Sequence, residues 1–385
     1  MKVLFLASSA IGHMDFGGLG FIRMDERFRA RGHETRWLTF GDQASRLQAH
    51  GCAAETLPEL AGLCLRPVGT LQDMDAQPKS HIRRVEQMRA IMNRIGQIKP
   101  DLLVVDRLFS GAGLIASRLD LPFIAIGTPG GYWRFFEDQE LGSITVRPMP
   151  GAIDSYAAYG EVLQQALGAP DAEFNSAWLN SPYLNAHFLG RTFYSDISSP
   201  RSVSVYHHSS RHQNSPDGPI GISLGNQGQT HRIEHVLGLL AQSGAVERTL
   251  TVFAGKRELQ EGLLGNWIDQ MRIQVRPWVD FSHALNGLSQ LVFLGGIGTI
   301  WHCVDQAIPM VIVPGLIGDQ QDNAHRVEAV RLGAHVLDHY GDEEIVDLVR
   351  RNALDKTRVE AIEDFRARSN YDVGLDELVD RAIAL

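Results

Sequence analysis

Residues 292–300 read VFLGGIGTI, and this stretch indicates how the surrounding chain folds. An apolar run typical of a buried strand ends at a cluster of glycines, and a helix is predicted to open at Thr299. Glycines let the backbone approach a ligand closely, and a helix N-terminus presents free N–H groups with about half a positive charge. The turn therefore suits a phosphate without a cationic side chain; a tight turn that binds nothing is the alternative.

The same alternation of strand and helix runs outward from this turn. In the second half, strands are predicted near 219–224, 249–254, 272–276, 290–294 and 309–313, with a helix near 319–333. In the first half, strands are predicted at 2–8, 34–40, 101–106 and 122–127, with helices over 21–31, 82–95 and 110–119. This alternation indicates parallel sheets with helices on both faces. We therefore expect an α/β protein with two Rossmann-like domains that face each other across a cleft.

Changes in composition mark the predicted domain boundaries. We expect an N-terminal domain over 1–206, a linker over 207–218, a C-terminal domain over 219–355 and a helical tail over 356–385. The linker is rich in Pro, Gly, Asn and Ser, and its histidines lack the spacing of metal ligands. Residues 128–200 interrupt the alternation and are rich in aromatic side chains. Such a segment is typical of a binding element, and a helical subdomain with its own core is the alternative.

The overall composition excludes several classes of protein. The chain has 385 residues and a formal net charge of −9, which argues against nucleic-acid or anionic-membrane partners. Its three cysteines, Cys52, Cys64 and Cys303, form no disulfide framework or zinc spacing and suit a reducing cytoplasm. No apolar run approaches the roughly 20 residues of a membrane span. The start, MKVLFLASSAIGH, is predicted as a buried strand, with a signal peptide as the alternative.

The residues after the glycine turn carry a more specific signal. The stretch 295–326 reads GGIGTIWHCVDQAIPMVIVPGLIGDQQDNAHR, and it resembles the C-terminal motif of the GT-B glycosyltransferases of plant and bacterial natural-product biosynthesis. The motif residues present, in order, are Gly295, Gly296, Gly298, Thr299, Pro309, Pro314, Asp319, Gln320, Asn323 and Ala324. The resemblance covers most of the chain and implies a GT-B fold and a UDP- or TDP-sugar donor. Neither glycine-rich stretch fits the G-x-G-x-x-G spacing of a dinucleotide fold.

The resemblance also implies which residues of the C-terminal domain bind the donor. The diphosphate would lie against Gly295, Gly296, Gly298 and Thr299 and against the loop residues Ser223, Gly225 and Asn226. The base would stack on Trp278, for which core packing is the alternative, with Val279 and His302 completing the base and ribose site. Asp319 and Gln320 would bind the sugar hydroxyls.

The chain departs from the family's pattern at three positions. Leu294 stands where the family has a histidine that contacts the donor phosphate, and His302 where it has a glutamate that contacts the ribose. Phe16 replaces a proline that follows the N-terminal histidine. Leu294 and His302 therefore support an alternative function, a catalytically degenerate GT-B protein that binds sugar nucleotides or partners a true transferase.

The N-terminal half resembles the family at its catalytic pair. The stretch IGHM places His13 in the first βα loop, where the family has its base, and PDLLVVD places Asp106 at a strand end, where the family has the supporting carboxylate. A neutral imidazole can deprotonate a hydroxyl near pH 7, and a carboxylate fixes its tautomer. A surface histidine and a capping aspartate are the alternative. Phe16, Trp133 and Phe136 are predicted to contact the acceptor.

The preferred interpretation is therefore an inverting glycosyltransferase of the hexosyltransferase type. It would move a sugar from a nucleoside-diphosphate sugar to a small acceptor that is partly aromatic or hydrophobic, with no metal and no bound cofactor. Besides the degenerate protein, a nucleotide-sugar epimerase is an alternative, although it would lack an acceptor pocket. The sequence leaves open whether the chain is a monomer or a homodimer.

Overall fold

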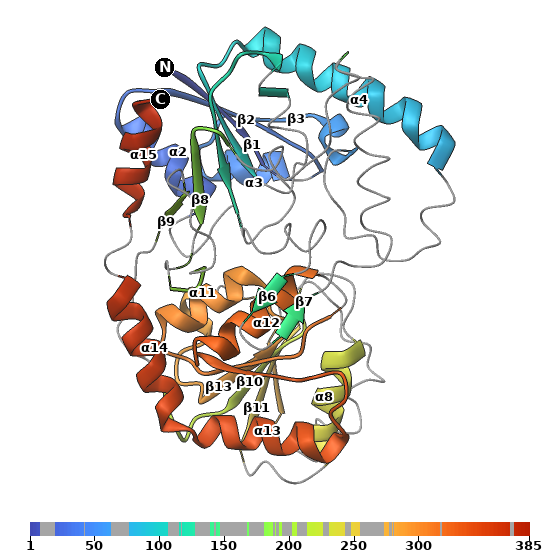
Figure 1. The fold of residues 1–385 in the computed structure, drawn as a ribbon, viewed down its shortest axis with the longest axis vertical. Helices are drawn as coiled ribbons and strands as arrows, with labels where there is room; N and C mark the ends of the chain where they lie inside the picture. The colour runs from blue at the N-terminus through green and yellow to red at the C-terminus, as the bar shows by residue number, and fades with distance from the viewer. Residues whose placement is uncertain are drawn as a thin grey trace. The chain divides into compact units, whose positions relative to one another are not determined.

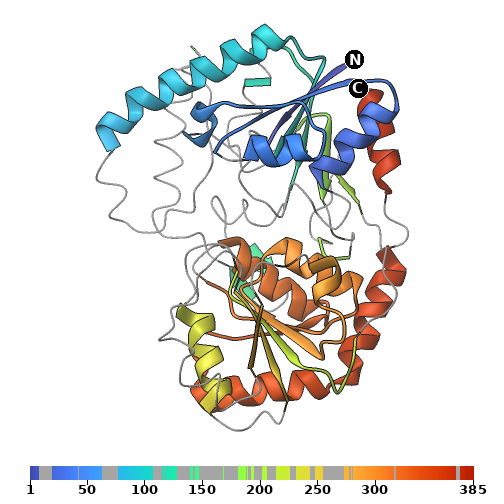
Figure 2. The same ribbon diagram turned by 180° about the vertical axis from the view of Figure 1, so that it is seen from behind.

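The computed structural model describes most of both halves of the chain. The described residues are 1–7, 20–41, 43–62, 77–106, 115–116, 118–127, 139–141, 144–146, 168, 181–187, 189, 192–194, 202–205, 214–225, 231–242, 248–254, 273–276, 279, 281–315, 318–369 and 373–385. They form two compact units (Figures 1 and 2). Unit 1 comprises Met1–Glu140, Thr145–His207 and Tyr371–Leu385, and unit 2 comprises Leu141–Ile144 and His208–Asn370. The predicted cleft between two domains stays a prediction.

Unit 1 contains a parallel sheet of seven strands in the order β3-β2-β1-β4-β5-β8-β9. The strands are β1 (Lys2–Leu6), β2 (Glu34–Thr39), β3 (Ala54–Thr56), β4 (Leu102–Asp106), β5 (Phe123–Ile126), β8 (Leu184–His187) and β9 (Ser202–Ser204). The helices of this unit are α2 (Phe21–Ala30), α3 (Gln43–Ala49), the 3-10 helix η1 (Pro58–Gly62), α4 (Gln77–Ile98) and α15 (Leu375–Ile383). The predicted parallel sheet with covering helices is confirmed.

The alternating sides of β1 explain how unit 1 is layered. Phe5 stacks on Trp37 of β2 with ring centroids 4.4 Å apart, and both rings lie close to Phe21 of α2. Leu4 and Leu6 point to the other face, where they share an apolar cluster with the α4 stripe. The two helices therefore cover opposite faces, and Lys2–Leu6 forms the predicted strand, buried at its last four positions.

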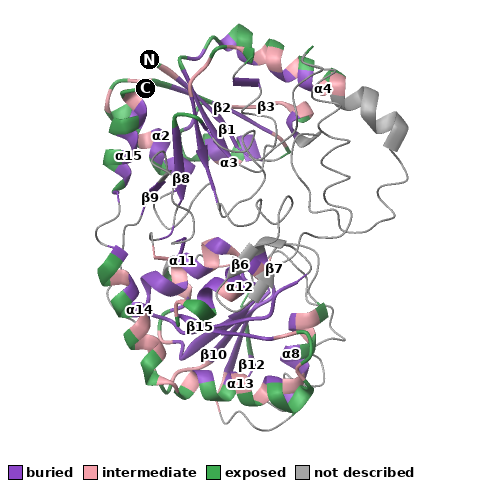
Figure 3. Ribbon diagram, viewed as in Figure 1, coloured by how far each residue is buried: buried purple, intermediate pink, exposed green. Residues whose placement is uncertain are grey.

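Unit 2 contains a parallel sheet of six strands in the order β12-β11-β10-β13-β14-β15. The strands are β10 (Ile220–Ser223), β11 (Leu250–Phe253), β12 (Ile273–Arg276), β13 (Gln290–Phe293), β14 (Met310–Ile312) and β15 (Gly333–His335). The helices are α8 (His231–Gln242), α10 (Phe281–Ala284), α11 (Ile297–Asp305), α12 (Gly318–Ala329), α13 (Asp342–Leu354) and α14 (Lys356–Ser369). The strands β10 and β13 are buried at every position (Figure 3), and α8 and α13 share one apolar cluster with Ile222 and Val292 on one face of the sheet.

Several short elements escaped the sequence prediction. Strands β3 and β15 have three residues each, AET and GAH, which give no apolar run to detect. A two-stranded ribbon of β6 (Gln139–Leu141) and β7 (Ile144–Val146) lies inside the segment that interrupts the alternation. Helix α13 is a further addition between the last predicted strand and the tail.

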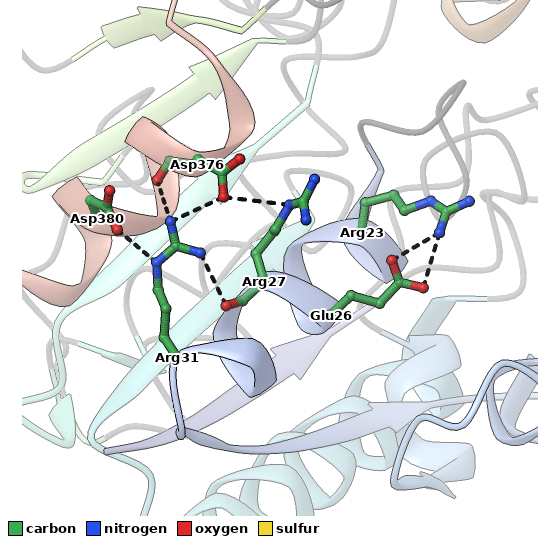
Figure 4. A network of polar contacts seen from close by, with 6 residues as sticks. All are labelled: Arg23, Glu26, Arg27, Arg31, Asp376 and Asp380. Atoms are coloured by element: carbon green, nitrogen blue, oxygen red, sulfur yellow. Dashed lines mark hydrogen bonds and ion pairs between the residues drawn. The ribbon is translucent and has the colours of Figure 1, made fainter. Parts of the chain in front are cut away.

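The predicted C-terminal tail is helical, but its two helices belong to different units. Helix α14 is part of unit 2, whereas α15 packs in unit 1 against α2. Arg31 makes ion pairs with Asp380 at 2.7 Å and with Asp376 at 3.0 Å, and Arg27 reaches Asp376 at 3.5 Å (Figure 4). A backbone hydrogen bond of 3.0 Å from Val373 to Ser204 precedes this helix. The last residues of the chain therefore complete the first unit.

No helix in the described part of the chain is long and apolar enough to cross a membrane.

Candidate functional site

The order of the strands in unit 2 identifies where a ligand is expected. The chain builds β10, β11 and β12 outward and then returns to place β13 on the other side of β10. Ile222 and Val292 are register partners in these two strands, so the loops that follow them leave the same edge side by side. This arrangement is a topological switch point, where open α/β sheets bind ligands beyond the carboxyl ends of their strands.

The glycine turn after β13 has one packed side and one open side. Gly295 has φ +95°, and a Cβ there would lie 2.8 Å from Cγ2 of Ile312 and 3.0 Å from the carbonyl oxygen of Gln320, so only glycine fits. Gly296 is the N-cap of α11, with φ −64° and no side-chain cap hydrogen bond. Among the described residues, a Cβ at Gly296 would meet no heavy atom within 4 Å. The start of α11 thus has room for a ligand.

The loop after β10 touches this turn. Gly225 has φ +70°, its N–H donates to Oγ of Ser223 over 3.4 Å, and a Cβ there would lie 3.0 Å from Cδ1 of Leu294. Leu294 is 6% exposed and belongs to the apolar cluster under the sheet edge. The side chain of Leu294 therefore fills core space. Asn226 lies outside the described residues.

Helix α12 braces the turn from the packed side. The side-chain Nδ2 of Asn323 donates to the carbonyl oxygen of Gly295 at 2.9 Å, and Oε1 of Gln320 accepts the N–H of Gly315 at 2.9 Å. Both side chains are buried. Asp319 lies in the first turn of α12, and its side chain is outside the described set. Asn323 appeared in the sequence only as a motif residue, because a contact between a helix and a distant turn leaves no local signal.

Helix α12 also carries a buried ion pair that the sequence analysis did not predict. Nε of Arg326 lies 2.9 Å from Oδ2 of Asp322, and the two side chains are 4% and 1% exposed. Further along the same helix, Glu328 lies 2.8 Å from Nδ1 of His335 in β15, and this hydrogen bond lowers the pKa of the Glu328 carboxyl. The sequence signal that could have revealed the first pair is the spacing of four residues between Asp322 and Arg326 on one helix.

His302 lies beside the segment predicted to hold the base. Its ring meets the ring of Phe281 edge-on, with centroids 6.2 Å apart and planes at 88°. The carbonyl oxygen of Phe281 accepts a hydrogen bond from Nε2 of Gln306 at 2.7 Å, which fixes α10 against α11. Val279 is half-buried just before α10, and Trp278 lies outside the described residues. The predicted ribose residue therefore lies against Phe281, two positions after Val279 in the chain.

Unit 1 repeats the switch-point topology. The chain forms β1, β2 and β3 and then returns to place β4 beside β1, with Leu6 and Val105 as register partners. Asp106 is the last residue of β4 and is 1% exposed. The loop after β1 that carries His13 and Phe16 is outside the described residues, as are Trp133 and Phe136. The pairing of His13 with Asp106 thus remains a prediction; Asp106 ends β4, and His13 follows β1, the strand beside it.

Neither described cysteine has the character of a nucleophile. Cys52 and Cys303 are free and buried. Burial and the nearby Asp25 carboxylate raise the pKa of the Cys52 thiol to about 12, and burial raises that of Cys303 well above its usual value. Among the residues that the structure describes, no three His, Cys, Asp or Glu side chains gather into a group that could hold a metal ion.

Comparisons with known proteins place this fold. No protein-family model matches the sequence, and no curated protein matches it significantly. Among solved structures, the chain is similar to the glycotransferase of kitacinnamycin, with a TM-score of 0.72 and 18% identity over 100% of this chain and 97% of that one. It is similar to CalG4, the calicheamicin glycosyltransferase, with a TM-score of 0.71 and 20% identity over 100% and 97%. The glycosyltransferase VinC in complex with DTDP matches with a TM-score of 0.64 and 15% identity over 100% of both chains. The predicted α/β class and GT-B fold, with two Rossmann-like sheets, are confirmed.

Proposed function

We propose that this protein is an inverting glycosyltransferase that moves a sugar from a nucleoside diphosphate to a small acceptor. The observation that carries the proposal is the glycine turn at the switch point of unit 2, braced on one side by α12 and open on the other. A turn of this kind suits a diphosphate, and the chain has the fold of solved glycosyltransferases along its whole length.

The diphosphate would be bound chiefly by the main chain. Gly295, Gly296, Gly298 and Thr299 supply the start of α11, and Ser223, Gly225 and Asn226 form the neighbouring loop. A helix N-terminus stabilises an anion by about 0.3–1 kcal/mol at an exposed site and by up to about 2 kcal/mol when partly buried. As the glycosidic phosphate bond breaks, the leaving oxygen gains negative charge, and this helix end would stabilise it without a metal ion.

Residues around this turn would bind the rest of the donor. Asp319 and Gln320 would contact the sugar hydroxyls; because Oε1 of Gln320 accepts the N–H of Gly315, its contact to a hydroxyl oxygen would fall to Nε2. Trp278, Val279 and His302 would form the base and ribose site. VinC was solved with DTDP, so a TDP sugar is the first donor to test here, with a UDP sugar second.

The acceptor chemistry would take place on unit 1. His13 would remove the proton from an acceptor hydroxyl, the freed oxygen would attack the anomeric carbon, and the bond from that carbon to the phosphate oxygen would break. Asp106 would hold the imidazole in one tautomer and stabilise its cation. Attack from the face opposite the leaving group inverts the anomeric centre. Phe16, Trp133 and Phe136 would contact an aromatic or hydrophobic acceptor, as in natural-product glycosylation, and the cytoplasm is the predicted location.

The test begins with nucleotide binding and ends with product configuration. TDP at 100 times its Kd should raise the free energy of unfolding by about 2.7 kcal/mol, which thermal unfolding detects. Incubation with TDP-glucose or UDP-glucose and a panel of phenols and alcohols should then release nucleoside diphosphate only when an acceptor is present. Proton NMR of the product should show the β-anomer from an α-linked donor. Retention of the α configuration would contradict the inverting mechanism.

One observation supports a second candidate, a sugar-nucleotide-binding protein without turnover. Leu294 replaces a phosphate-contacting histidine and packs into the core instead. That candidate predicts tight TDP binding with no product from any acceptor. Consumption of the donor without an acceptor, and with a new sugar nucleotide formed, would instead identify an epimerase.

A further inference from the structure

We propose that Asn323 is a positioning residue that aims the backbone N–H of Gly296 at the donor diphosphate. The inference rests on the proposed function, because it assigns a second-turn residue of α12 to the same site.

The contact itself is short and sheltered from water. Nδ2 of Asn323 donates to the carbonyl oxygen of Gly295 at 2.9 Å, between a helix and a turn 28 positions earlier in the chain. Asn323 is 1% exposed, and Gly295 is buried as well. A buried hydrogen bond of this geometry fixes the orientation of both groups, since losing it leaves a carbonyl oxygen without a partner in a dry place.

The orientation of that carbonyl decides where the next N–H points. The carbonyl of Gly295 and the N–H of Gly296 belong to one planar peptide unit, and the described chain contains no cis peptide bond. In a trans peptide these two groups point in opposite directions. Because Asn323 holds the carbonyl toward α12, the N–H of Gly296 points away from α12.

The side away from α12 is the side with room for a ligand. A Cβ on Gly295 would meet the α12 backbone at Gln320, whereas one on Gly296 would meet no described heavy atom within 4 Å. The same loop edge carries the uncapped start of α11 and, beside it, the loop of Ser223 and Gly225. An N–H directed there would donate to a phosphate oxygen, together with the first amides of the helix.

Two adjacent glycines are the reason why this peptide unit needs a hydrogen bond to fix its orientation. A peptide unit flanked by glycines can rotate between alternative orientations at little steric cost, because both residues tolerate positive and negative φ. Gly295 already has φ +95° and Gly296 has φ −64°. Without the Asn323 amide, the unit would divide its population between orientations, and the Gly296 N–H would face the ligand only part of the time.

The experiment measures binding of TDP, inorganic pyrophosphate and thymidine to the full chain by calorimetry. Asn323→Ala should weaken TDP and pyrophosphate by about three- to tenfold, the value of one hydrogen bond, while thymidine binding stays within error. Gly296→Pro removes the N–H itself at a φ that proline adopts, so it should weaken the same two ligands at least as much. The double variant should bind TDP no more weakly than Gly296→Pro alone, because both changes act on one N–H.

Two remote variants serve as matched controls. Asn352→Ala removes another buried amide of unit 2, which donates to Oε1 of Gln290 at 2.8 Å, and Gly374→Pro places proline at the N-cap of α15, where φ is −75°. Both should bind TDP as the wild type does, although Asn352→Ala should unfold at a lower temperature.

The outcomes separate this inference from the proposed function. Wild-type TDP affinity in Gly296→Pro, or additive losses in the double variant, would overturn the role of Asn323 while leaving the transferase intact. Equal losses for thymidine and pyrophosphate in Asn323→Ala would identify a general loss of structure and would also overturn it; if that variant fails to fold, Gly296→Pro still decides. A wild type that binds none of the three ligands would overturn the proposed function and this inference together.

Discussion

The two units place different chemistry at the same topological position. In unit 2, the neighbouring strands β10 and β13 lead into loops with glycines whose backbone is proposed to bind the donor, and the adjoining side chain, Leu294, is apolar and buried. In unit 1, the neighbouring strands β1 and β4 lead to a loop with His13 and end at a buried carboxylate, Asp106. In the proposed function, one switch point would bind an anion with its main chain, and the other would transfer a proton with side chains. Substitutions in unit 2 should accordingly change stability and donor binding by altering the backbone and its packing, whereas those in unit 1 should change the turnover rate.

The largest effect is expected at the proposed base. His13→Ala should lower kcat by about 10²–10⁴-fold, the usual contribution of a positioned base, while TDP affinity, set by unit 2, stays constant. Asp106→Asn should cost less because it leaves the base in place, and the double variant should be little worse than His13→Ala. Steady-state kinetics and calorimetry check both statements. If Asp15→Ala abolishes turnover while His13→Ala does not, the base is Asp15.

The second effect compares a glycine from each unit. Gly295→Ala forces a side chain into positive φ and against Ile312 and the α12 backbone, so we expect a loss of about 2–4 kcal/mol in the free energy of unfolding and weaker TDP binding. Gly32, after α2, has φ +81°, but no heavy atom of the described residues lies within 4 Å of an added Cβ, so Gly32→Ala should cost only about 1 kcal/mol. Urea unfolding of the two variants measures the difference. Equal losses in the free energy of unfolding would mean that Ile312 and the α12 backbone shift at little cost to make room for the added methyl group.

The third effect concerns Leu294, which precedes the glycine turn. Because Leu294 packs inside the apolar cluster, Leu294→His would bury a polar ring there, and we expect a loss of about 1–3 kcal/mol in the free energy of unfolding with no gain in donor affinity. Leu294→Met, which keeps the apolar volume, is the control and should cost less than about 1.5 kcal/mol. A lower donor KM in Leu294→His would show that the imidazole escapes the core and reaches the phosphate.

The elements that sequence could predict are those whose physics is local. β1 and β13 are continuous apolar runs, and the α2 and α4 stripes have helical spacing, so both sheets and their facing helices were predictable. Strands β3 and β15 were not predictable, since three residues of mixed polarity form a strand only because they pair with a neighbouring strand. The tail was predictable as helical but not as divided, because the docking of α15 depends on Arg31 meeting residues about 350 positions away.

The candidate site divides in the same way. The glycines, Thr299 and Gln320 were named because they match the motif order of the family that the sequence resembles, and glycines in such a turn also suit a phosphate. The brace from Asn323 to Gly295 could not, since it depends on how α12 packs against the turn. The apolar packing of Leu294 is likewise a tertiary fact, and it changes the expected effect of restoring a histidine there.

A smaller effect is expected where the two ends of the chain meet. Arg31 is 25% exposed and pairs with two carboxylates that are each 62% exposed, and these hydrogen bonds raise the pKa of the Arg31 guanidinium. Since pairs of this exposure contribute about 0–1 kcal/mol each, Arg31→Ala should lower the free energy of unfolding by about 1 kcal/mol. The loss should shrink in 1 M salt, and Arg23→Ala, whose pair with Glu26 lies within α2, is the matched control with a smaller effect. Equal, salt-independent losses in both variants would mean that α15 is held by its apolar face alone.

The smallest effect is a pH dependence that compares one carboxylate from each unit. Arg94 in unit 1 and His335 in unit 2 lower the pKa of Glu55 and of Glu328 by hydrogen bonding to the charged form. A carboxyl whose pKa is lower in the folded chain binds fewer protons there than in the unfolded chain, so its stabilisation is present above the unfolded pKa and is lost as the pH falls through the folded pKa. Each pair should therefore stabilise the protein above about pH 4.5 and progressively less below it. Glu55→Gln and Glu328→Gln should each lower the free energy of unfolding near pH 6 by less than about 1 kcal/mol, because both carboxylates are partly exposed. Thermal unfolding should show this loss near pH 6 and almost none near pH 3. A loss of the same size at both pH values would assign the role of these residues to packing rather than charge.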